Sequence, residues 1–204
     1  MALTKYSMSF TTGGLLCNAS EKVAHLYLEL GDWARVRDRA LEAGLMQTRM
    51  QSSAKRIYRE ISARLQTLTD EEIEMFVHGG DQQRIHLLWL AVCCRYSFIR
   101  DFSVEILRER FLTLRHEIAN EDFDAFFNAK AEWHHELDKI TPGTRIKLRQ
   151  NLFRMLHEAE YIGSSNRIQP VVLAPQIATL ISRRGSDALY IYPTLDSEPN
   201  RRTR

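Results

Sequence analysis

Hydrophobic residues recur at helical spacing along most of the chain, and polar residues mark the ends of the segments. Val23, Tyr27 and Leu30 share one face of a helix that we expect Ser20 to cap and Gly31 to end. The same pattern predicts further helices over residues 33–43, 48–65, 70–79, 82–95, 97–116, 121–138, 141–160 and 175–182. Their expected N-terminal signals are Asp32, Thr69 with Glu72, Asn120 and Thr141-Pro142.

Strand-like patterns are confined to the two ends of the chain. Residues 6–10 alternate between large apolar residues and serine, residues 161–173 resemble a small hairpin, and residues 188–192 predict a last strand. The Thr11–Gly14 run has no lysine that would complete a nucleotide-binding loop, so we interpret it as a turn. Residues 196–204 are polar and are expected to form a disordered tail. The chain is therefore predicted to be mainly α.

Charge is distributed unevenly, although the net charge is only +2. Residues 1–67 carry 10 Lys and Arg against 6 Asp and Glu, residues 68–140 carry 8 against 15, and residues 141–204 carry 10 against 5. Two basic ends around an acidic middle favour contact with a polyanion at the ends. An ordinary solvated surface explains the same pattern equally well, so charge alone does not choose between them.

Motifs of enzymatic chemistry are missing from the sequence, which contains no GxxxxGK[ST], GxGxxG, HExxH, CxxC or GxSxG. The neighbours His134 and His135 diverge by about 100° on a helix and cannot easily share a metal ion. Cys93 and Cys94 end an apolar stretch over 86–94 that is too short to cross a bilayer. We therefore predict no enzymatic activity, no cofactor and no metal site, in a reduced, cytoplasmic setting.

Residues 32–65 match a helix-turn-helix, in which Gly44 lies in the turn and the second helix is basic. Spacings of 3, 4 and 3 place four residues of the second helix on one face, with Lys55 close by: Arg49, Ser52, Arg56 and Arg59. Such a face can lie along phosphates, and its arginines can reach guanine edges. A solvated amphipathic helix is the alternative.

A second candidate module follows the order of a winged helix, with helices over 121–138 and 141–160 and then a hairpin. Its positive charge comes from Arg145, Lys147, Arg149 and Arg154 on the second helix and from Arg167 on the expected wing. A helical subdomain that is closed by a hairpin and binds nothing explains these features equally well.

Three stretches carry a resemblance to a known family: KYSMSFTTGGLL at 5–16, the segment from IRDFSVEILRERFL to NLFRML at 99–156, and RIQPVVL at 167–173. Together they resemble the BrxA family of the bacterial BREX phage-defence systems. The resemblance implies a small, mostly helical, non-enzymatic component encoded beside a methyltransferase and a large ATPase. It also implies a fold likened to the RNA-binding NusB proteins, and DNA-binding helix-turn-helix-like modules. The family is sometimes labelled an inner-membrane protein, but no segment here approaches ~20 apolar residues.

These observations lead to one hypothesis and two alternatives. We expect a helical bundle with helix-turn-helix-like modules and small β elements at the N-terminus and near the C-terminus. Its predicted parts are a basic module over 1–67, a central helical core over 68–120, a winged-helix-like module over 121–195 and the tail. The leading function is that of a non-enzymatic accessory component that binds double-stranded DNA and other BREX subunits, and no membrane. The alternatives are an assembly adaptor for protein partners and an RNA-binding protein of the NusB type.

Overall fold

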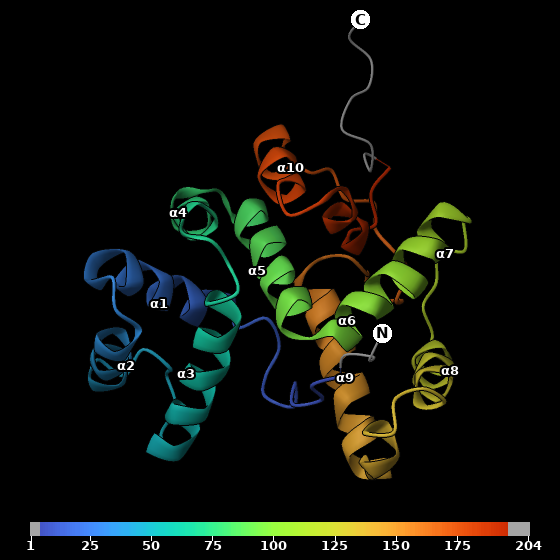
Figure 1. Ribbon diagram of the computed structural model, residues 1–204, viewed down its shortest axis with the longest axis horizontal. Coiled ribbons are helices and arrows are strands. Elements are labelled where there is room, and N and C mark those ends of the chain that lie inside the picture. Colours follow the sequence, from blue (N-terminus) through green and yellow to red (C-terminus); the bar gives the residue numbers. More distant parts are fainter. Residues whose placement is uncertain (1–4, 196–204) are drawn as a thin grey trace, which may run out of the picture. The chain divides into compact units, whose positions relative to one another are not determined.

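The computed structural model describes residues 5–195, and α-helices account for most of them (Figure 1). This confirms the mainly α fold that the hydrophobic pattern predicts. The described chain divides into two compact units: residues 12–95 form the N-terminal unit, and residues 5–11 together with 96–195 form the C-terminal unit. The expected tail over 196–204 lies outside the described residues.

The N-terminal unit contains five helices, and α1 packs against the other four. These helices are α1 (Cys17–Leu30), α2 (Trp33–Glu42), α3 (Gln51–Leu65), α4 (Asp70–His78) and α5 (Asp81–Arg95). Apolar residues at helical spacing in α1 and α3 supply part of its core, since Val23, Ile61 and Leu65 are fully buried. Burial of this apolar stripe is the main source of helix stability in water.

Capping signals in the sequence mark the start of several helices. At the start of α2, the Asp32 carboxylate accepts a hydrogen bond from the backbone N–H of Arg35 at 2.8 Å. At the start of α4, the Thr69 hydroxyl accepts from the Glu72 N–H at 3.3 Å, and the Glu72 carboxylate accepts from the Thr69 N–H at 2.8 Å. At the start of α9, the Thr141 hydroxyl accepts from the Thr144 N–H at 3.3 Å. These hydrogen bonds confirm the three predicted caps. Such caps can be predicted from the sequence because each one acts within a single turn of backbone.

Two predicted N-cap residues are wrong, because their helices begin earlier than expected. The first helix begins at Cys17, so Ser20 lies fully buried in its first turn and does not cap it. The helix α8 begins at Asn120, and its N-cap is Ala119, whose backbone N–H donates to Asp122 at 2.7 Å. A polar residue indicates that a helix end is near, but the backbone can turn helical before that residue.

The C-terminal unit holds the remaining helical elements. These are α6 (Ser97–Phe102), the π-helix η1 (Ser103–Arg108), α7 (Glu109–Leu112), α8 (Asn120–Ala131), the 3₁₀-helix η2 (Leu137–Lys139), α9 (Pro142–Glu158), α10 (Pro175–Ser182) and the 3₁₀-helix η3 (Ser186–Ile191). An aromatic cluster joins α6 to α8, because the ring of Phe98 lies 5.1–6.0 Å, centroid to centroid, from those of Phe123, Phe126 and Phe127. Such edge-on pairs add to the free energy of apolar burial.

Residues 5–11 pack into the C-terminal unit without forming a strand, so the predicted N-terminal β element is wrong. The alternation still marks buried positions, since Tyr6 and Phe10 are both in the core. The segment is bound by side chains rather than by a neighbouring strand. The Tyr6 hydroxyl donates to Asp101 at 2.7 Å, and the Asn151 amide donates to the backbone carbonyl of Phe10 at 3.1 Å.

No strand occurs within residues 5–195, where β pairing is limited to two isolated bridges. The expected hairpin over 161–173 is reduced to a bridge between Ile162 and Ile168, and a second bridge pairs Arg167 with Glu117. The expected strand over 188–192 is wrong, because η3 covers most of it. A short apolar run fits a buried helical turn as well as a strand, so periodicity cannot separate the two.

Candidate nucleic-acid interface

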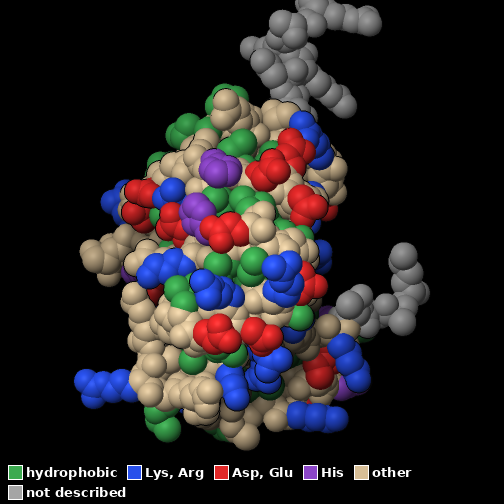
Figure 2. All heavy atoms as spheres, turned by 90° about the vertical axis from the view of Figure 1, so that its left-hand side faces the viewer, with side chains coloured by type: hydrophobic (Ala, Val, Ile, Leu, Met, Phe, Trp, Pro, Cys, Tyr) green, Lys and Arg blue, Asp and Glu red, His purple; other side chains and the backbone are tan. Residues whose placement is uncertain are grey.

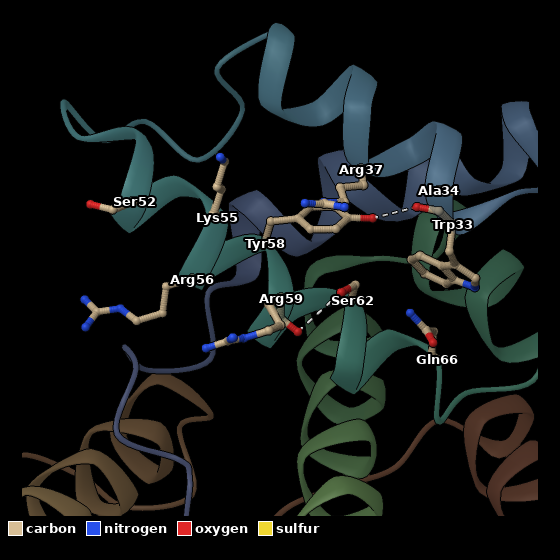
Figure 3. A pocket seen from close by; sticks show the side chains of 10 residues that line it. All are labelled: Trp33, Ala34, Arg37, Ser52, Lys55, Arg56, Tyr58, Arg59, Ser62 and Gln66. Carbon is tan, nitrogen blue, oxygen red and sulfur yellow. Dashed lines mark hydrogen bonds between the residues drawn. The ribbon is translucent and has the colours of Figure 1, made fainter.

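A groove of about 620 Å³ lies between α2 and α3 in the N-terminal unit (Figure 3). Its walls come from the two helices and from the residue that follows α3. The lining residues are Trp33, Ala34, Arg37, Ser52, Lys55, Arg56, Tyr58, Arg59, Ser62 and Gln66. Its volume falls within the ~300–1,000 Å³ range of ligand-binding sites in proteins.

The groove is basic because four cationic side chains line it and remain exposed: Arg37, Lys55, Arg56 and Arg59. Within the described part of the chain, none of the four makes an ion pair. Figure 2 shows the side where α1 and α2 lie, with Lys and Arg side chains spread over its middle and lower parts and Asp and Glu side chains among them. The groove therefore offers positive charge to a ligand without first breaking an internal contact.

Two aromatic residues give the groove a rigid wall. The Tyr58 hydroxyl donates a hydrogen bond to the backbone carbonyl of Trp33 at 3.0 Å, which ties α3 to the start of α2. The indole of Trp33 stacks on Tyr27 of α1, with 4.3 Å between ring centroids and 16° between ring planes. Burial raises the pKa of Tyr58 to about 12, with a smaller opposing effect from Arg37 and a supporting one from Asp38. Tyr58 therefore stays neutral near pH 7.

Four of the five site residues predicted in the N-terminal module line this groove: Ser52, Lys55, Arg56 and Arg59. The fifth, Arg49, is exposed but lies ahead of α3, because that helix begins at Gln51 and not at residue 48. The predicted common helical face of Arg49 and Ser52 is therefore wrong. The connection between α2 and α3 spans residues 43–50, which is longer than the three- or four-residue turn of a helix-turn-helix.

In the C-terminal unit, two of the predicted arginines are held by α8. The Arg145 guanidinium donates to the carboxylate and the backbone carbonyl of Asp124, at 2.9 Å each, and to Asn128 at 2.8 Å. It also lies over the ring of Phe127, 4.4 Å from the centroid. Arg149 forms an ion pair with the same Asp124. These contacts fasten α9 to α8, so both arginines have an evident packing role.

The other basic residues predicted for the winged-helix-like module remain exposed and do not line the groove between α2 and α3. Lys147 and Arg154 are exposed on α9, and Arg167 is exposed at the bridge to Glu117. The predicted helix over 121–138 ends at Ala131, and the 3₁₀-helix η2 follows before α9. The chain between the two long helices is therefore longer than the expected turn at residues 139–140.

Sequence reasoning missed several residues of the groove, among them Trp33, Arg37, Tyr58 and Gln66. A signal for part of this set was available. Trp33 and Arg37 are four residues apart and share one face of α2, and the polar stripe of α3 continues at helical spacing to Ser62. Only the packing of α2 on α3 turns these two stripes into one site.

His134 packs in the core, and the apolar stretch over 86–94 contains the buried residues of the helix α5. His134 stacks on Tyr6, with 3.9 Å between centroids, and lies 3.1 Å from Glu136, whereas His135 is exposed beside Asp138. No group of three or more His, Cys, Asp or Glu residues within 5–195 could hold a metal ion. None of the described helices is long and apolar enough to span a membrane.

Comparison with known proteins gives one consistent result. The BrxA family model matches residues 4–185. A BREX protein BrxA from Escherichia coli O9:H4 (strain HS) is 24% identical over 179 residues, which cover 87% of this chain and 84% of that protein. A BREX protein BrxA from Bacillus cereus (strain H3081.97) is 25% identical over 127 residues, which cover 62% of this chain and 64% of that protein.

Among solved structures, the crystal structure of an uncharacterized protein from Magnetospirillum magneticum has a similar fold. Its TM-score is 0.77 at 20% sequence identity, with 93% of this chain and 98% of that chain covered. At this identity the likeness concerns the fold alone. The family assignment depends on the family model, which spans most of the sequence and includes all three stretches that carry the resemblance. The chain belongs to the BrxA family.

Proposed function

We propose that this protein is a non-enzymatic component of a BREX phage-defence system and binds double-stranded DNA through the groove between α2 and α3. The names of the two relatives, each a BREX protein BrxA, support the first part. The basic groove supports the second. The observation that carries the DNA-binding proposal is the set of exposed cations along α3, namely Lys55, Arg56 and Arg59, which have no internal ion pair within residues 5–195.

Electrostatics favours a polyanion as the ligand of this surface. Residues 32–66, which include α2 and α3, carry 8 Lys and Arg against 4 Asp and Glu. One of those acids, Glu60, already forms an ion pair with the buried Arg64. Duplex DNA presents one negative charge per ~1.7 Å of its axis, and each phosphate that a cation neutralises releases counterions. Exposed cations along one helix can therefore follow a phosphate backbone.

Fluorescence anisotropy with an end-labelled 20-bp duplex, measured across 50–200 mM salt, tests this proposal. The triple variant Lys55→Ala, Arg56→Ala, Arg59→Ala should bind at least tenfold more weakly at low salt. Its slope of log K against log salt should be smaller by about 2.7, because three phosphate contacts each contribute ~0.9. Single-stranded RNA and duplex RNA in the same titration test the NusB-like alternative.

The matched control removes three positive charges from the C-terminal unit: Lys147→Ala, Arg154→Ala, Arg167→Ala. This control should change DNA affinity by less than threefold, because these side chains do not line the groove. Equal losses in both triple variants would mean that net charge, and not the groove, determines binding. Unchanged binding of the groove variant would refute the site assignment.

The second candidate function is that of an assembly adaptor, and exposed apolar side chains in the C-terminal unit favour it. Trp133 is 71% exposed, and Leu114 and Val172 are exposed to a similar extent. Large exposed apolar residues are enriched where proteins bind one another. Failure to bind any nucleic acid, together with co-purification of other BREX subunits that the Trp133→Ala variant loses, would favour this function.

A further inference from the structure

The two ends of the α2–α3 groove differ in chemistry. Figure 3 shows the indole of Trp33 and the amide of Gln66 near one end, with Ser62 beside them, and Ser52, Lys55 and Arg56 toward the other. The distance along α3 from Ser52 to Gln66 is about 21 Å, since each helical residue rises ~1.5 Å. One end therefore offers an aromatic surface with hydrogen-bonding groups, and the rest offers positive charge.

The aromatic end is held in place from two sides. Tyr27 covers one face of the Trp33 indole, and the Tyr58 hydroxyl binds the backbone carbonyl of the same residue. The indole remains partly exposed and lines the groove. A ring that is already fixed loses little conformational entropy when a ligand stacks on it.

A purely phosphate-binding surface has no need of these groups. Cations alone account for contact with the backbone of a regular duplex, whose bases are stacked on one another and paired inside the helix. An aromatic ring beside a side-chain amide is instead typical of sites that take an unstacked base, where the ring stacks on the base and the amide reads its edge.

We propose that the groove accommodates one unpaired nucleotide of the bound DNA, with its base against Trp33, its edge at Gln66 and the neighbouring phosphates along Arg59 and Arg56. This inference rests on the proposed DNA-binding function and names the substrate class of the same site. The groove should therefore prefer DNA with a locally unpaired base to a perfect duplex.

Anisotropy titrations with three end-labelled 20-bp duplexes test the inference: one perfect, one with a single-nucleotide bulge, and one with an abasic bulge. The base bulge should bind about tenfold more tightly than the other two, because stacking of one base on an aromatic side chain contributes this much. The abasic bulge has the same flexible backbone, so it separates recognition of the base from recognition of a bend. Equal affinity for the base bulge and the abasic bulge would overturn the inference.

Variants then test whether the preference for the base bulge depends on residues of the groove. Trp33→Ala should abolish the preference, so that the base bulge and the abasic bulge bind this variant with equal affinity. Because Trp33 also stacks on Tyr27, the exposed Gln66→Leu is a second variant without this structural role, and it should reduce the preference two- to fivefold. The control Trp133→Ala, which removes an exposed tryptophan of the C-terminal unit, should leave the preference unchanged.

The remaining outcomes separate this inference from the proposed function. Equal affinity for all three duplexes, with the loss expected of the Lys55, Arg56 and Arg59 variant, overturns the inference and leaves DNA binding intact. Absence of binding to every duplex overturns the proposed function and the inference with it. Tight binding of a polyglutamate peptide in place of DNA, with the same dependence on Trp33, would overturn the inference in favour of an acidic protein segment.

Discussion

The arginines of the two units illustrate two different uses of the same side chain. In the N-terminal unit, Arg56 and Arg59 line a groove and have no carboxylate partner among the described residues. In the C-terminal unit, Arg145 and Arg149 both bind Asp124, and together they join α9 to α8. The sequence places both pairs on basic amphipathic helices, so local charge density does not distinguish them.

The difference lies in the neighbouring helix. Opposite Arg145, α8 presents Asp124 and Asn128, which accept hydrogen bonds from the guanidinium, and Phe127, whose ring lies against it. Opposite Arg59, α2 contributes Trp33, Ala34 and Arg37 to the groove, and none of these is an acid. Asp38 of α2 acts on the pKa of Tyr58 but forms no ion pair with Arg56 or Arg59 among the described residues. An arginine is available to a ligand where it has no ion pair with the element packed beside it.

The largest expected effect concerns Arg64, a buried arginine of the N-terminal unit that has a structural role and is not available to a ligand. Arg64 is only 1% exposed and donates to Glu60 at 2.8 Å and to the backbone carbonyl of Gly14 at 2.8 Å. Arg64→Ala should lower the free energy of unfolding by about 3 kcal/mol, because it removes the hydrogen bonds that Arg64 donates to a carboxylate and to a buried carbonyl. Urea denaturation measures this loss.

The matched control for that variant is Arg56→Ala, which removes an exposed arginine of the same helix. It should change the free energy of unfolding by less than about 0.5 kcal/mol. A loss below about 1 kcal/mol for Arg64→Ala would mean that burial does not make this arginine structural.

A smaller loss of stability is expected on removal of Asp124, the acid that binds both Arg145 and Arg149. Asp124→Ala should lower the free energy of unfolding by about 2 kcal/mol, since it removes two partly exposed ion pairs and their charged hydrogen bonds. DNA affinity should not fall, because Asp124 does not line the groove. Asp138→Ala, which removes a more exposed acid of the same unit, is the control for chemical denaturation. Equal stability of the two variants would contradict the packing role of Arg145 and Arg149.

The smallest expected effect is the contribution of Tyr58, in the wall of the groove, to the pH dependence of stability. The pKa of Tyr58 is about 12 in the folded protein, against about 10 in an unfolded chain. A raised pKa stabilises the folded state fully below pH 10, and the contribution is lost as pH rises toward 12. At pH 11 this loss is about 1 kcal/mol.

Tyr58→Phe removes the titrating hydroxyl, so the variant should lack this part of the alkaline destabilisation. The difference between the two proteins in denaturation midpoint, followed from pH 8 to pH 11, isolates Tyr58 from the other tyrosines. A difference that stays constant across this range would show that the hydroxyl ionises as easily in the folded state as in the unfolded chain.

Local sequence signals predicted much of the helical structure and part of the lining of the groove. Asp32, Thr69 and Thr141 cap helices as expected, because a cap is formed by backbone within a single turn. The stripe from Ser52 to Arg59 was found because helical spacing alone places these residues together. Arg49 was misplaced because the sequence does not show where the connection after α2 ends.

The sequence by itself determined the helical content, most of the caps and the basic stripe of α3, since each depends on residues a few positions apart. Only the tertiary structure decided that Tyr6 and Phe10 are buried without a strand, that Asp124 binds two arginines, and that Trp33 and Tyr58 complete a groove. Tyr58 and Trp33 are 25 residues apart, and Asn151 and Phe10 are 141 apart. Such contacts form when packed helices bring distant positions together, and no spacing within one segment encodes them.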